Sequence, residues 1–306
     1  MKLIARTAAF VALSATAIAL GASSAQALTL DNGSLKLTIN DGNGAINSVL
    51  FGGSEFYRQG TYVSDFGFQS GTDTSTFAEN NAYGSTGVPV TVVGSSGSAS
   101  VEGTFTGGGA NISFSRVYSL VPGLNVIRTI TKFVNNKGAD TTLSAFDTFD
   151  PDQGRDKGHG FKTYNDVLTL VTDEGLAKVG QATELGGLSV VIGSLNPATT
   201  VASGNPFQIS SGSDLNNFFA SPFDGNGVFS DQGTHIGIQK LLTAGSSFSF
   251  AYDQAFGSSS SGAQAAFISA HSGVPIPTPA LLPGLIGLGL GVLRKRKAEA
   301  AASSEA

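Results

Sequence analysis

The sequence predicts an all-β protein built as one large antiparallel β-sandwich. Three observations predict this class: 13% of the 306 residues are charged, 41 residues are glycine, and apolar residues alternate with polar ones along much of the chain. Long soluble helices need charged residues on their wet faces, so this composition excludes helical bundles and coiled coils. Many short alternating segments separated by glycine-rich turns are typical of a sandwich.

Alternation with a period of two residues marks the strands of the body. Leu35, Leu37 and Ile39 share one face, and a turn at 41–44 joins their strand to a second one at 45–51. Further strands are predicted at 99–105, 112–120, 124–134, 167–172, 188–195, 234–242 and 246–252. Helical periodicity is found only near 214–219 and 263–270.

The body of the chain is acidic and contains no cysteine. Between residues 28 and 273 there are 11 cations and 20 anions, a formal net charge of −9. Such a charge repels phosphate backbones, so nucleic-acid binding is not expected. The lack of cysteine excludes a disulfide scaffold, thiolate metal sites and cysteine catalysis, so core packing must hold the body together.

The N-terminus has the pattern of a secretory signal peptide. Two basic residues precede an uncharged run that extends to Leu30, and Ala25 and Ala27 supply the small residues that signal peptidase accepts. The pattern predicts a signal helix over 1–27 and a mature chain that begins at Leu28. An uncleaved anchor is the alternative, because the run is long enough to span a bilayer.

A proline-rich stalk, an apolar run and a basic cluster follow one another at the C-terminus. They are the stalk residues Pro277, Thr278, Pro279 and Ala280, the run Leu281–Leu293, and the cluster Arg294, Lys295, Arg296 and Lys297. Proline keeps the stalk from being helical. The run predicts a short transmembrane helix of about 20 Å, which is a marginal anchor in a hydrocarbon core of about 30 Å. The basic cluster is expected to stay in the cytoplasm, with the body across the membrane.

This tail resembles the PEP-CTERM sorting signal of Gram-negative envelopes, in the Pro-Thr-Pro-Ala variant that is common in cyanobacteria. The resemblance implies transient insertion in the inner membrane, processing by an exosortase-type membrane protease, and delivery to the cell envelope, the outer surface or the extracellular matrix. Thr278 stands where the name-giving form has Glu, and residues 298–306 follow the basic cluster. An ordinary tail anchor, or a helix-dimer face at Gly287 and Gly291, is the alternative.

The order of segments in the body resembles the galactose-mutarotase-like supersandwich. The resemblance rests on the opening strand, glycine turn and strand, and on 118–149, where an Asn-rich turn separates two strands. It implies a supersandwich, and a jelly-roll-like sandwich is the alternative architecture for a large antiparallel β-sandwich. That family's catalytic His and Glu have no counterpart that we can place in this sequence, so no catalytic residue is assigned.

These observations divide the chain into five predicted segments. They are a signal peptide at 1–27, a β-sandwich body at 28–257, a Ser/Gly-rich linker at 258–273, a sorting tail at 274–297 and a cytoplasmic tail at 298–306.

One acidic stretch is a candidate metal site. Asp147, Asp150, Asp152 and Asp156 lie close together, and calcium takes six to eight oxygen ligands, which clustered carboxylates and loop carbonyls supply. The spacing departs from the twelve-residue calcium loop, and a solvated turn after a strand is the alternative. If the alternation continues, Asp147 points to the apolar side, where it needs a cation or an arginine as its partner.

The sequence predicts an exported protein with a structural, adhesive or glycan-associated role, with exopolysaccharide as a partner. His159, His235 and His271 are expected to be solvated or structural, although His159 is near enough in sequence to join the acidic stretch. A carbohydrate-active enzyme and a calcium-stabilised adhesin are the alternatives. A sheet face lined by convergent His, Glu or Asp with Tyr would favour the enzyme.

Overall fold

Three antiparallel sheets make up the part of the chain that the structure, a computed structural model, describes: residues 27–57, 64–82, 86–204 and 208–272. The predictions for the signal peptide, the proline stalk, the apolar run and the basic cluster concern residues outside these ranges, apart from Ala27. Within these ranges no helix has the length and apolar character needed to cross a bilayer.

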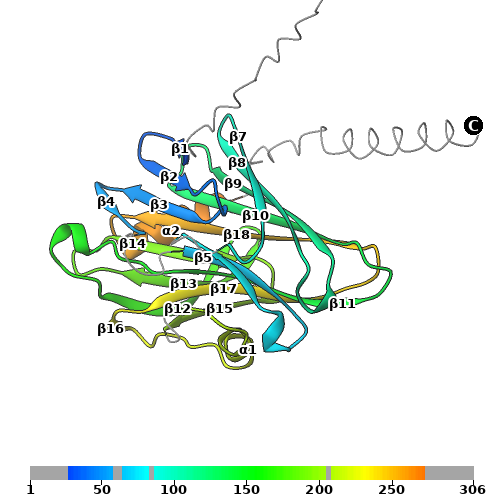
Figure 1. Cartoon of the computed structure of the whole chain (residues 1–306). Helices are drawn as coiled ribbons and strands as arrows, with labels where there is room; N and C mark the ends of the chain where they lie inside the picture. Colours follow the sequence, from blue (N-terminus) through cyan, green and yellow to red (C-terminus); the bar gives the residue numbers. More distant parts are fainter. Residues whose placement is uncertain (1–26, 58–63, 83–85, 205–207, 273–306) are drawn as a thin grey trace, which may run out of the picture.

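The strands are arranged in sheets of four, nine and five (Figure 1). The four-stranded sheet contains, in spatial order, β1 (Leu28–Asp31), β2 (Leu35–Ile39), β3 (Ile46–Phe51) and β4 (Ser54–Glu55). The nine-stranded sheet contains β16 (Val228–Ser230), β12 (Thr163–Thr172), β13 (Gly175–Thr183), β14 (Ser189–Ser194), β18 (Ser247–Gly257), β10 (Val126–Asn135), β9 (Ile112–Leu120), β8 (Ser98–Phe105) and β7 (Val90–Ser95). The five-stranded sheet contains β15 (Thr199–Gly204), β17 (Gly233–Leu242), β11 (Thr141–Phe149), β5 (Ser64–Ser70) and β6 (Ala78–Asn81).

The helical elements are few and short. They are α1 (Gly212–Ala220), α2 (Ser260–Ala270) and the 3₁₀ turns η1 (Thr74–Thr76), η2 (Gly107–Gly109) and η3 (Arg155–Lys157).

The predicted antiparallel sandwich is confirmed, and so are its opening hairpin and both helical segments. The β2–β3 hairpin turns at 41–44, where Gly44 has φ +76° and its carbonyl accepts a hydrogen bond of 2.9 Å from the hydroxyl of Tyr118. A left-handed φ of this kind costs glycine little, which explains the residue at this turn. The last strand, β18, continues beyond the predicted end at 252 to Gly257.

The core lies between the nine-stranded sheet and the other two sheets. Phenylalanines from both layers meet there: Phe68 of β5 packs against Phe114 of β9 and Phe133 of β10, with ring centroids 4.8 and 5.7 Å apart. Each buried aromatic ring removes a large apolar area from water, so such rings dominate the stability of the sandwich. The interior is therefore rich in phenylalanine beside aliphatic side chains.

Helix α1 covers the outer face of the five-stranded sheet. Ser211 caps its N-terminus by accepting the backbone N–H of Asp214, and Leu215 and Phe218 pack with Phe146 of β11 in a small second core. Strand β11 is therefore buried on both faces, which is why its polar and apolar positions are almost all inaccessible.

Helix α2 corrects the prediction that 258–273 is a Ser/Gly-rich linker. Ser259 caps the helix by accepting the N–H of Gly262, and Phe267 packs against Val179 and Val191 on the outer face of the nine-stranded sheet. A Cβ at Gly257 would lie 2.2 Å from the nitrogen of Ala263, so glycine is needed where the chain turns back onto β18. Ser259 therefore caps the helix and Gly257 allows two backbone segments to approach closely, so this segment is not a flexible linker.

A buried ion pair joins the two main layers. Arg116 of β9 and Asp147 of β11 pair bidentately between the sheets, and the Arg116 guanidinium also donates to the hydroxyl of Tyr252 at 2.8 Å. The guanidinium carbon lies 4.7 Å from the ring centroid of Tyr118 and 4.9 Å from that of Phe66. The prediction that Asp147 points to the apolar side and requires an arginine or a cation is confirmed, with Arg116 as the partner.

We predict that Asp147→Asn lowers the free energy of unfolding by about 3–5 kcal/mol, because it leaves the buried Arg116 cation without a counterion. Replacing both residues, as Arg116→Met with Asp147→Leu, removes both charges and should restore most of the loss. Urea unfolding measures each variant, with Lys178→Gln on an exposed position of β13 as the control. A double variant as unstable as the single one would contradict this account.

Candidate functional site

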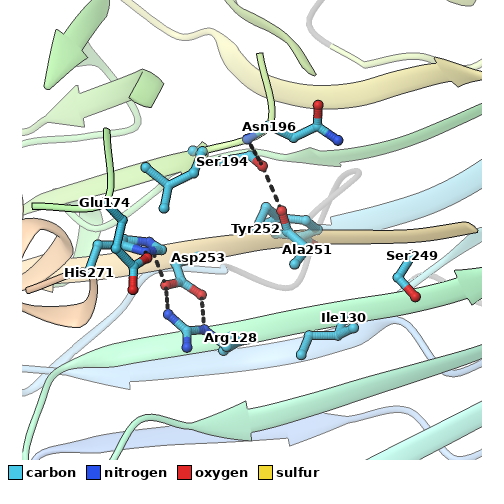
Figure 2. A pocket seen from close by; sticks show the side chains of 12 residues that line it. Arg128, Ile130, Glu174, Ser194, Asn196, Ser249, Ala251, Tyr252, Asp253 and His271 are labelled. Carbon is cyan, nitrogen blue, oxygen red and sulfur yellow. Dashed lines mark hydrogen bonds and ion pairs between the residues drawn. The ribbon is translucent and has the colours of Figure 1, made fainter. Parts of the chain in front are cut away.

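A pocket opens on the outer face of the nine-stranded sheet, beside the C-terminal end of α2. It has a volume of about 320 Å³ and is lined by residues of β10, β14 and β18, by Glu174 in the β12–β13 turn, and by His271, which follows α2. Figure 2 shows charged groups gathered at one end of the pocket, with Ile130, Ala251 and Ser249 continuing away from them along two strands.

Strand alternation decides which side chains reach the pocket. In β18, Phe250 and Tyr252 face the core, so Ser249, Ala251 and Asp253 face outward. In β10, Arg128 faces the same way, and the register of the two strands places Arg128 directly opposite Asp253. Opposite charges at directly paired positions stabilise each other across the sheet.

The charged end of the pocket is a continuous network. Arg128 donates from Nε to Asp253 Oδ1 at 2.8 Å and from Nη2 to Asp253 Oδ2 at 2.6 Å, which is a bidentate pair. His271 lies between two carboxylates, with Nε2 3.0 Å from Asp253 and Nδ1 3.0 Å from Glu174. Arg128 also donates to the carbonyl of Ala270 at 3.3 Å, so the guanidinium holds the last turn of α2 as well as the sheet.

Burial and pairing act in opposite directions on the acids and bases of this network. Burial alone would raise the pKa of Asp253, but its bonds to Arg128 and His271 outweigh this effect and hold that pKa below the usual range. Desolvation would lower the pKa of His271, but the Asp253 and Glu174 carboxylates outweigh it and raise that pKa above 6.5. Asp253 is thus held ionised, and His271 is biased toward its cation.

This arrangement suits hydrogen bonding to a polar ligand better than proton transfer. The Asp253 side chain is 2% exposed and both of its oxygens are taken by Arg128 and His271, whereas Glu174 is 50% exposed and accessible from the pocket. A general acid or base needs a free group near its reacting atom. The pocket instead offers fixed charged donors and acceptors beside small Ser and Ala side chains.

The acidic stretch predicted to bind metal is split by the fold. Asp147 lies in the core with Arg116, and Asp156 accepts the backbone N–H of Glu55 at 2.9 Å. Neither carboxylate belongs to the group that Asp150 and Asp152 form among the described residues. Asp150 and Asp152 do meet, and a residue distant in sequence joins them: Asp231, whose carboxylate oxygen lies within 4.8 Å of theirs. The predicted set of four ligands is therefore corrected to a cluster of three carboxylates.

The environment of Asp150 is unfavourable for a negative charge. Burial, together with the neighbouring carboxylates of Asp152 and Asp231, raises the pKa of Asp150 to about 9, and its buried Oδ1 has no hydrogen-bond partner among the described residues. A bound cation would reverse this effect by neutralising the carboxylates. The calcium hypothesis thus stays a prediction, now for Asp150, Asp152 and Asp231.

The remaining histidines have structural partners, as predicted. His159 forms an ion pair with Glu184, whose other contacts are backbone N–H groups of the following turn. His235 bonds to the hydroxyl of Thr148 at 2.9 Å and is buried, because α1 covers its side of β17.

Sequence reasoning missed Arg128, Glu174 and Asp253 and placed His271 in a linker. Two of these residues carried a detectable signal. Asp253 interrupts otherwise uncharged outward positions in β18, and Arg128 shares the outward face of β10 with Lys132; a charge in mid-strand needs a partner nearby. Nothing in the sequence indicates that these two residues are cross-strand neighbours.

No protein-family model matches this sequence, and no curated protein matches it either. Solved structures do resemble it. A bacterial glucoamylase complexed with acarbose superposes with a TM-score of 0.53 at 14% identity, covering 81% of this chain and 34% of that one. The chain thus spans about a third of the glucoamylase, and at this identity the likeness shows a shared fold alone.

Two smaller proteins are matched over almost their whole length. A galactose mutarotase related enzyme from Lactobacillus acidophilus gives a TM-score of 0.46 at 11% identity, covering 77% of this chain and 99% of that one. A galactose mutarotase-like protein from Lactobacillus casei gives a TM-score of 0.46 at 10% identity, covering 76% of this chain and 100% of that one.

We predict that the His271 network makes stability depend on pH. Because the pKa of His271 is raised on folding, its stabilising contribution is fully present below pH 6.5 and is lost as pH rises through the higher pKa of the folded protein. When the pH is raised from below 6.5 to above the pKa of His271 in the folded protein, the urea midpoint of the wild type should therefore fall more than that of His271→Gln. His235→Gln, which changes a histidine outside this network, is the control. The same dependence of the urea midpoint on pH in the wild type and in His271→Gln would refute the prediction.

Proposed function

We propose that this chain is an exported glycan-binding protein of the cell envelope or extracellular matrix, without enzymatic activity of its own. The observation that carries the proposal is the solvent-open pocket in which Arg128, Asp253, His271 and Glu174 form a fixed charged network beside small polar side chains. Sugar hydroxyls both donate and accept hydrogen bonds, so the exposed Glu174 carboxylate and the exposed Ser249 hydroxyl suit them, while Arg128 and His271 hold the buried Asp253 in place.

Other ligand classes suit the pocket less well. Apart from Ile130, Leu195, Ala251 and Tyr252, its walls are formed by polar or charged residues and one glycine, which argues against a lipid-like ligand. The net charge of −9 on residues 28–273 repels nucleic acids and other polyanions. The glucoamylase that shares this fold over about a third of its own length was solved in complex with acarbose.

Binding is favoured over catalysis because the Asp253 carboxylate already bonds to other side chains of the protein. Asp253 is enclosed by Arg128 and His271, so it has no free oxygen to accept a proton from a substrate. Glu174 is the accessible carboxylate, and it has no second free carboxylate beside it in the pocket lining, whereas glycoside hydrolysis usually employs a pair.

The proposal places this body outside the cytoplasm through its two terminal signals. The first strand begins at Leu28, the residue where the predicted signal peptide leaves the mature chain. The described body ends at Ser272, so the predicted stalk at 277–280 follows the packed helix α2 after a few residues.

We predict that Ala251→Trp abolishes glycan binding by filling the pocket, since Ala251 is exposed on its floor. The measurement is retention of the purified body on immobilised polysaccharides, including glucans, mannans, galactans and alginate. Thr169→Trp, at an exposed position of β12 away from the pocket, is the matched control and should bind like the wild type. Turnover of a saccharide by the wild type, or its failure to bind any of these polymers, would contradict the proposal.

We also predict that the exported protein lacks both terminal signals. In a Gram-negative host with an exosortase-type protease, mass spectrometry of surface-released protein should find Leu28 at the N-terminus and a C-terminus before Arg294. Replacing Pro277 and Pro279 with alanine should block the C-terminal processing. A released chain that still ends at Ala306, or retention of the whole chain inside the cell, would refute the export proposal.

A further inference from the structure

The outer face of the nine-stranded sheet is covered over only part of its width. Helix α2 packs over β13, β14 and β18 through the cluster that contains Phe267, Val179 and Val191. Over β8 and β9 no described helix packs on this face, and α2 meets β10 near Arg128. A second hollow, of about 450 Å³, is found there, and it is larger than the pocket beside α2.

The two hollows lie along the same strand. Arg128 and Ile130 of β10 line the pocket beside α2, and Lys132 and Val134 of β10 line the second hollow. These four residues alternate along one strand, so they face the same way in a single row. From Arg128 to Val134 the row is about 20 Å long at the usual rise of a strand.

Strand register extends this row sideways with short hydroxyl side chains. Lys132 is paired with Ser249 of β18 on one side and with Ser115 of β9 on the other, and Ser115 is paired with Glu102 of β8. Two residues further along β10, Val134 is paired with Ser247 of β18 and Ser113 of β9. We call this surface, from Arg128 to Val134 with its paired serines, the serine track.

The chemistry of the serine track favours an extended, hydroxyl-rich partner. Its serines are exposed or half-exposed, and such side chains donate and accept hydrogen bonds at regular intervals. A protein partner would need an apolar centre, and Ile130 and Val134 are the only large apolar side chains in the row. A single sugar residue would fill one hollow, whereas a row of this length holds several linked pyranose rings.

We propose that the serine track binds an extended, uncharged polysaccharide chain that occupies both hollows at once. The uncharged class follows from the net charge of −9 on residues 28–273, which repels polyuronates, and from the cancelling charges of Lys132 and Glu102 in the second hollow. This inference rests on the proposed glycan-binding function and names its ligand class and its length.

The test is the dependence of affinity on chain length. Calorimetry of the purified body with cello-oligosaccharides, and with the corresponding mannan and galactan series, from monosaccharide to hexasaccharide, should show at least about a tenfold gain in affinity along one series. Ser115→Trp, which blocks the second hollow alone, should remove this gain and keep the affinity for the shortest ligand that binds. Ala251→Trp should abolish the binding of short and long ligands alike, and Thr169→Trp should change the affinity for neither.

The outcomes separate this inference from the function on which it rests. If short saccharides bind and longer ones bind no tighter, or if Ser115→Trp leaves the gain intact, the serine track is refuted and the glycan-binding pocket stands. Tighter binding of alginate oligomers than of every uncharged series refutes the uncharged class. If no saccharide of any length binds, the proposed function fails together with the track.

Discussion

The sandwich depends on one constraint: two charges that are buried between its layers must meet. Arg116 and Asp147 come from different sheets, and each would be strongly unfavourable in the core without the other. Their pairing fixes β9 relative to β11, and the rings of Phe66, Tyr118 and Tyr252 around the guanidinium leave little freedom in that placement. Apolar packing supplies most of the stability, and the buried pair disfavours any alignment of the layers that would separate its two charges.

The outer face of the nine-stranded sheet consists of one half that α2 covers and one half that no described helix covers. Helix α2 buries one half with apolar contacts, and its last turn is held by Arg128 and His271. The same two side chains form the charged end of the pocket. The contacts that dock the helix and the groups that would meet a ligand are therefore partly the same, which links the stability of α2 to the integrity of the site.

How much the sequence predicts depends on whether a feature is local. The β2–β3 hairpin, the inward direction of Asp147 and the helical tendency at 263–270 follow from patterns of a few residues, and all three are confirmed. The acidic stretch shows the limit of such reasoning. Asp147 and Asp150 are neighbours in sequence, yet one faces an arginine in the core while the other meets Asp231 from a distant strand end.

By itself, the sequence determined that the body is a β-protein and which face of each strand is apolar, and its net charge predicts that nucleic acid is a poor partner. These properties follow from composition and from a two-residue period, which act within one strand or through total charge. Only the tertiary structure decided that Arg128 lies opposite Asp253 and that α2 brings His271 to both Asp253 and Glu174. The reason is physical: strand order and helix docking are set by the joint burial of many residues far apart in the chain, and no local pattern encodes that sum.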